Sequence, residues 1–144
     1  MINWNDPECK ITEHFTVEEA ITLHSWNRLA TETDGLDDIC RDKIVDLCNK
    51  METVREILDS SINVHCMFRS SDYNASVLHI LPHDVHSLGM AIDFDCSPKL
   101  TVEEIKNVLE SRLEELGLRM EFGTTTWVHL DTRPPGPSGR YFNP

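Results

Sequence analysis

The sequence lacks the features that mark several other classes of protein. It has no apolar run near the ~20 residues that cross a bilayer, and no internal repeat, low-complexity tract or Gly/Ser-rich linker. Its 5 cysteines are odd in number and form no C-x-x-C pair, which argues against a structural zinc cluster or a dithiol redox site. We therefore expect one globular domain, residues 1–144, with reduced thiols.

Positive charge is also scarce. The chain has 13 Lys and Arg against 25 Asp and Glu, a formal net charge of -12. Such a surface repels phosphate backbones and anionic lipids, so we expect neither nucleic acid nor a membrane as partner. The first ten residues hold no basic segment followed by an apolar one, so we expect no signal peptide and synthesis in the cytoplasm.

Helices are predicted from capping and periodicity. Capping boxes at Thr16–Glu19 and Thr101–Glu104 predict helices that run to about Leu29 and to Leu116, the second stopped by Gly117. Between them, apolar residues that recur mostly three or four apart from Leu36 to Leu58 predict one long amphipathic helix.

Strands are predicted from short apolar, β-branched runs. The last two of these runs flank a Gly-Thr-Thr-Thr turn and predict a hairpin, whereas the proline-rich residues 134–144 predict an irregular tail. Together the elements predict an α+β fold with helices packed on a small, mostly antiparallel sheet. The expected strands are Ile62–Phe68, Met90–Phe94, Leu118–Phe122 and Trp127–Asp131.

Two segments carry metal-binding side chains in apolar surroundings. His86 precedes a small-residue stretch that leads into a strand holding Asp93, and His129 lies inside a strand in Trp127-Val128-His129. An unpaired carboxylate among apolar neighbours is costly, and a metal ion removes that cost. Two imidazoles and one carboxylate form a common catalytic zinc set, although a single strand histidine is more often a hydrogen-bonded core residue.

A third segment, Phe68-Arg69-Ser70, places an arginine at the end of a strand, where it can clamp a carboxylate or polarise a carbonyl. In this order the three segments resemble the zinc D-alanyl-D-alanine carboxypeptidase family, which includes D,D-dipeptidases and phage L-alanyl-D-glutamate endopeptidases. Its pattern runs S-G-Y-R-S, S-x-H-x-x-G-x-A-x-D and W-x-H, and its fold is shared with Hedgehog signalling domains. The resemblance spans about residues 11 to 133 and is strongest to the small phage members.

The resemblance implies a zinc peptidase that hydrolyses peptidoglycan stem peptides, as a D-Ala-D-Ala carboxypeptidase or an L-Ala-D-Glu endopeptidase. Arg69 would bind the substrate carboxylate or the developing oxyanion, with Ser70 and Asn74 around it and Trp127 as a pocket wall. We expect a monomer that reaches the wall through a holin lesion or inside a virion. The implied Zn²⁺ ligands are His86, Asp93 and His129.

The chain departs from the family pattern at three places. Asp84 stands where the pattern has serine, and Cys66-Met67 replace its Ser-Gly. Thr126 occupies the position, three residues before the final histidine, where several members carry an acid. We therefore assign the general base to Glu121, which a hairpin can fold back toward the metal, with a solvated edge-strand glutamate as the equal alternative.

We expect no role in the site for four other polar residues. We expect His79 and His83 to be ordinary loop residues, and Asp131 and Arg133 to be surface groups at a strand end. The missing acid and the acidic surface leave open a catalytically inactive metal-binding or structural domain of the same fold. A metal-free scaffold is the third alternative, and it requires the two histidines and the aspartate to lie apart.

Overall fold

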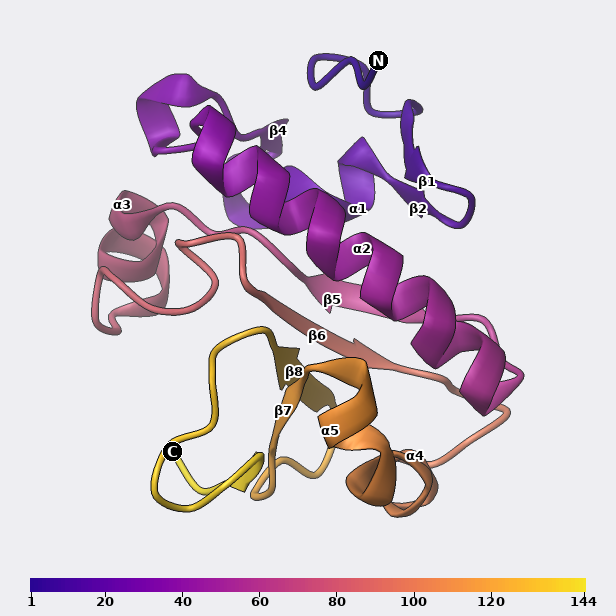
Figure 1. Cartoon of the computed structure of the whole chain (residues 1–144). Coiled ribbons are helices and arrows are strands. Elements are labelled where there is room, and N and C mark those ends of the chain that lie inside the picture. The colour runs from indigo at the N-terminus through magenta and orange to yellow at the C-terminus, as the bar shows by residue number, and fades with distance from the viewer.

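The computed structural model covers residues 1–144 and is organised around a five-stranded sheet in the order β5-β6-β8-β7-β9. The first four strands in this order pair antiparallel, and β9 pairs parallel with β7 (Figure 1). The predicted α+β fold, with helices on a small and mostly antiparallel sheet, is confirmed. The strands are β5 (Asn63–Cys66), β6 (Ala91–Asp95), β8 (Val128–Asp131), β7 (Arg119–Glu121) and β9 (Tyr141–Phe142).

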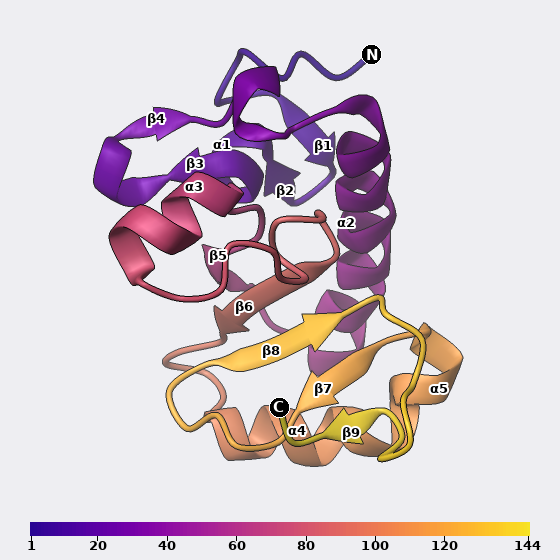
Figure 2. The same ribbon diagram turned by 90° about the vertical axis from the view of Figure 1, so that its left-hand side faces the viewer.

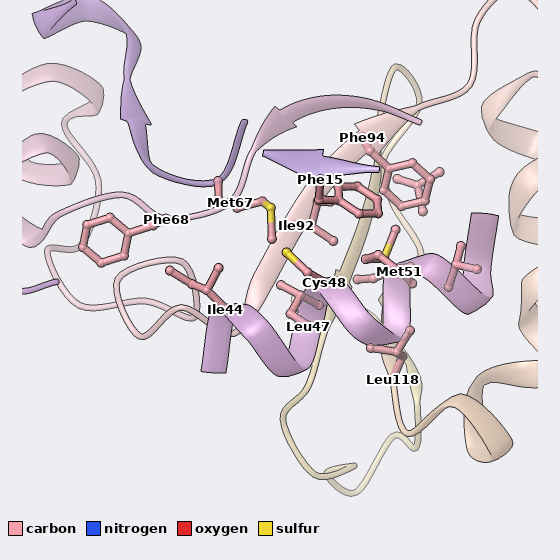
Figure 3. Close-up of a cluster of buried hydrophobic side chains, with 14 of the residues drawn as sticks. Phe15, Ile44, Leu47, Cys48, Met51, Met67, Phe68, Ile92, Phe94 and Leu118 are labelled. Carbon is pink, nitrogen blue, oxygen red and sulfur yellow. The ribbon is translucent and has the colours of Figure 1, made fainter. Parts of the chain in front are cut away.

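One face of the sheet is covered by helices. The long helix α2 (Asp38–Leu58) begins as predicted, where the Asp37 carboxylate accepts a hydrogen bond from the Cys40 amide at 2.8 Å. Its apolar stripe packs against the alternate strand residues that point inward, such as Ile92 and Phe94 (Figure 3). The opposite face therefore carries the intervening residues, including Asp93.

The helix predicted from the capping box at Thr101 divides into α4 (Val102–Leu109) and α5 (Leu113–Leu116), which are separated by a 3₁₀ turn over Glu110–Arg112. Its capping box and its stop are both present, because Gly117 adopts the left-handed conformation, φ 68°. None of the helices combines the length and the apolar composition that a bilayer-crossing segment needs.

The N-terminal helix is shorter than predicted. After a hairpin of β1 (Lys10–Thr12) and β2 (Phe15–Thr16), α1 spans only Val17–Ile21. The next residues form a second hairpin, β3 (Thr22–Leu23) with β4 (Arg28–Leu29), across a turn in which Asn27 is left-handed. The capping box marks where this helix begins, but strand pairing decides where it ends.

The C-terminal tail was predicted to be irregular, and this was wrong for its last part. The amides of Met120 and Phe122 donate to the carbonyls of Arg140 and Phe142, at 2.7 and 2.8 Å, which joins β9 to the free edge of β7. Figure 2 shows β6, β8 and β7 side by side, with β9 beyond β7. The predicted hairpin of β7 and β8 is present.

A loop borders the uncovered face of the sheet. Ser70 caps the short helix α3 (Ser71–Tyr73), which continues into a π-helical turn over Asn74–Leu78. The chain then runs through residues 79–90 back to β6. Gly89 (φ 74°) allows this loop to lie against α2, since a Cβ there would meet the Cys40 carbonyl oxygen at 2.7 Å.

Candidate metal centre

The register of β6 and β8 brings the first two candidate ligands together. Asp93 lies directly opposite His129, and both side chains point to the face that the helices leave uncovered. The loop before β6 adds His86. One side-chain donor atom from each of the three residues falls within 4.8 Å of the others, so the structure unites the predicted set.

The geometry of these three residues fits a zinc ion. His86 Nε2 lies 3.3 Å from Asp93 Oδ2, and His129 Nδ1 lies 2.8 Å from Asp93 Oδ1. Four ligands at about 2.0–2.1 Å around a tetrahedral centre would stand roughly 3.3 Å apart. The other ring nitrogen of His86, Nδ1, hydrogen-bonds to the Met67 carbonyl oxygen at 2.7 Å, which leaves Nε2 to face the metal position.

His129 is held by a buried ion pair that the sequence analysis missed. Its Nε2 lies 3.0 Å from Asp131 Oδ2, and the two Asp131 oxygens accept from Arg119 Nε and Nη2 at 2.8 and 2.9 Å. Asp131 is fully buried, so the expectation of a surface group was wrong. Residues two apart in a strand share a face, and the spacing His-x-Asp was the available signal.

The charges of the triad stabilise one another. Burial opposes the charged form of His86, but the adjacent Asp93 carboxylate outweighs it and raises the pKa of His86 to about 10. The pKa of His129 is raised in the same way, against burial, by Asp131 and Asp93. Burial likewise disfavours the Asp93 carboxylate, yet both imidazoles hold its pKa below the ordinary range. This carboxylate stays ionised, and a divalent cation would take the place of the imidazole protons.

The triad forms the floor of a cleft of about 710 Å³. Arg69, Glu121 and Trp127 line it, together with His83 from the loop. The register of Met120 with Leu130, continued by one residue, sets Glu121 beside His129 on the same face. Glu121 is half-buried where it lines the cleft.

Not every predicted residue reaches the cleft. The Ser70 hydroxyl accepts a hydrogen bond from the Tyr73 amide at 3.1 Å, and it is buried at the start of α3. Asn74 is buried too, and its amide donates to the Pro82 carbonyl at 2.9 Å. These two side chains shape the loop, whereas His79, also outside the cleft, lies exposed.

The C-terminal strand completes one wall. Phe142 lines the cleft, lies 6.1 Å from the His129 ring and stacks beneath the Arg119 guanidinium at 4.1 Å. No motif in the sequence marks Phe142 or Arg119, because their positions depend on how β9 and β8 pair with β7.

An open His-Asp-His cluster at the base of a cleft is the kind of site found in metal-dependent hydrolases. A protein-family model described as Peptidase M15 matches residues 13–131, most of the chain. The protein therefore belongs to the M15 peptidase family, whose members are zinc-dependent. Searches among curated proteins and among solved structures found no match.

Proposed function

We propose that the protein is a zinc peptidase of the small phage type that hydrolyses peptidoglycan stem peptides, at a D-Ala-D-Ala or an L-Ala-D-Glu bond. The observation that carries this proposal is the His-Asp-His cluster on the floor of a cleft that Arg69 and Glu121 also line, in a chain of the M15 family. We further propose that it acts as a monomer and reaches the wall through a holin lesion or in a virion.

The ligand residues have separate tasks. His86 would present Nε2 and His129 would present Nδ1, with Asp93 between them and Asp131 holding the far nitrogen of His129. Zinc bound there would lower the pKa of water to about 7 and polarise the peptide carbonyl. The second bond of each ring fixes its orientation, so neither ring has to reorganise when substrate binds.

Glu121 would act as the general base. Its carboxylate accepts a proton from the attacking water as the oxygen bonds to the carbonyl carbon, and it passes that proton to the leaving amine nitrogen when the C–N bond breaks. Its place beside His129 on the cleft face supports this role. Thr126 has no ionisable group at neutral pH and cannot take the task.

Substrate contacts would come from the rim of the cleft. Arg69 would donate to an oxygen of the substrate, and Trp127, which is 36% exposed, would form a wall for its side chains. Ser70 and Asn74 would support these contacts by fixing the backbone that leads from Arg69 into the loop.

The test is hydrolysis of a synthetic stem pentapeptide, followed by mass spectrometry, for wild type and Glu121→Gln. We expect the variant to keep its zinc, measured by elemental analysis, and to lose at least about 100-fold in turnover. Glu114→Gln, on the exposed side of α5, is the matched control. Full turnover in Glu121→Gln would refute the base, and a zinc-loaded wild type without activity would favour the inactive binding domain.

A further inference from the structure

Asp84 lies in the cleft two residues before His86, where the family pattern has serine. Its Oδ2 accepts a hydrogen bond from Arg69 Nη2 at 2.9 Å. The two side chains are mostly withdrawn from water, 25% and 17% exposed. The arginine proposed to contact substrate is therefore already ion-paired with a carboxylate of its own chain.

This carboxylate is held firmly in place. Its other oxygen accepts from the Ser87 amide at 2.9 Å and from the Asn74 side-chain amide at 3.2 Å. The Asp84 amide in turn donates to the Ser87 hydroxyl at 3.0 Å. With both oxygens engaged, Asp84 cannot turn away from Arg69 without breaking several bonds at once.

Neither of the other two arginines that line the cleft is both buried and without a carboxylate partner. Arg119 donates hydrogen bonds from Nε and Nη2 to the Asp131 carboxylate, and Arg133 is exposed at the rim. A free carboxylate of a ligand would have to share the Arg69 guanidinium with Asp84, and two carboxylates at one cation repel each other. An amide oxygen can accept from the same guanidinium without that repulsion.

We propose that Asp84 determines specificity by offsetting the charge of Arg69, so that the cleft selects an internal peptide bond over a bond next to a free C-terminal carboxylate. This inference rests on the proposed function, and it narrows the substrate class to peptides that continue, as an amide, beyond the residue released. It argues against carboxypeptidase action at a free D-Ala terminus.

The experiment compares two stem peptides that differ only at the C-terminus, one a free acid and one an amide. The ratio of kcat/KM for amide over acid is measured for wild type, Asp84→Asn and Asp84→Ser, each loaded with zinc. We expect wild type to favour the amide and both variants to move the ratio toward the acid by about ten- to a hundredfold, the range for a hydrogen bond to a charged group. Asp46→Asn on α2 makes the same charge change outside the cleft and should leave the ratio alone.

A binding measurement separates this inference from the proposed function. The affinities of the two peptides for zinc-loaded Glu121→Gln, with and without Asp84→Asn, are measured by calorimetry and need no turnover. Absence of cleavage by wild type would count against the proposed function alone, while the binding ratio still decides on Asp84. A ratio that stays the same in folded Asp84→Asn and Asp84→Ser would overturn the inference.

Discussion

Replacing Asp131 with asparagine tests the part of the site that lies behind the metal ligands. The substitution keeps the shape of the side chain but removes the charge that faces Arg119 at 2.8 and 2.9 Å and His129 at 3.0 Å. Whichever way the new side-chain amide is turned, its NH₂ group would point at either the Arg119 guanidinium or the His129 ring. The variant therefore disturbs the orientation of His129 without touching the metal position.

The magnitude follows from two separate effects. Removing the acceptor behind a metal-bound histidine costs about 10- to 100-fold in metal affinity, which is about 1.4–2.7 kcal/mol. Leaving one partner of a buried ion pair uncompensated costs about 3–5 kcal/mol of folding stability. We expect the lower end of that range here, because Phe142 still stacks on the Arg119 guanidinium.

Zinc affinity is measured by competition with a fluorescent chelator, and stability by urea unfolding of chelator-treated protein. Asp95→Asn is a suitable control, since Asp95 lies on β6 and contacts His65 outside the triad. Zinc affinity of Asp131→Asn within twofold of wild type would show that Asp131 does not orient His129, and would refute this reasoning.

The raised pKa of His86, about 10 against an unfolded value near 6.5, predicts a pH dependence of the metal-free protein. The stability contributed by the charged form of His86 is complete below about pH 6.5 and is lost as the pH rises toward about 10. Urea unfolding of chelator-treated protein should therefore show a free energy of unfolding that declines over this pH range. A free energy that does not change with pH would contradict the prediction. A second prediction concerns Lys106, whose buried amine donates to the carbonyls of Thr124 and Phe122 at 2.6 and 3.2 Å and so anchors the turn that directly follows Glu121 at the end of β7. Lys106→Met should lower the free energy of unfolding by about 1–3 kcal/mol, measured by thermal or urea unfolding, and should also lower turnover. Lys10→Met, on the exposed strand β1, should change neither quantity. Equal behaviour of the two variants would contradict the anchoring role of Lys106.

Local patterns in the sequence predicted the elements that depend on local interactions. Helix α2 follows from the spacing of apolar residues between Leu36 and Leu58, and the start of α4 follows from the capping box at Thr101. The end of α1 could not be predicted in this way. Thr22 and Leu23 leave the helix because they pair with β4, a contact that depends on the turn at Asn27.

Strand β9 was missed for a related reason. Two residues, Tyr141 and Phe142, are too few for a recognisable alternation, and the prolines around them favour irregular structure. The strand forms because β7 offers an unpaired edge, which is a property of the assembled sheet and not of the tail itself.

For the site, motif spacing singled out His86, Asp93 and His129, and the structure brings them together. It did not single out Asp131, because an acid at a strand end is usually solvated, and burial is decided by what covers the strand. Arg119 lies opposite Asp131 only through the register of β7 with β8. The residues that orient the ligands come from strand pairing, which no local pattern reveals.

The central claim is that His86, Asp93 and His129 hold a catalytic zinc ion, and metal content tests it most directly. Wild type, His129→Ala and the control His14→Ala, whose side chain hydrogen-bonds to Glu52 outside the triad, are purified, loaded with zinc, dialysed and analysed for metal. The account predicts about one zinc per chain in wild type and His14→Ala, and loss of that zinc in His129→Ala. Wild-type protein that takes up no zinc, or His129→Ala that retains it in full, would contradict the account.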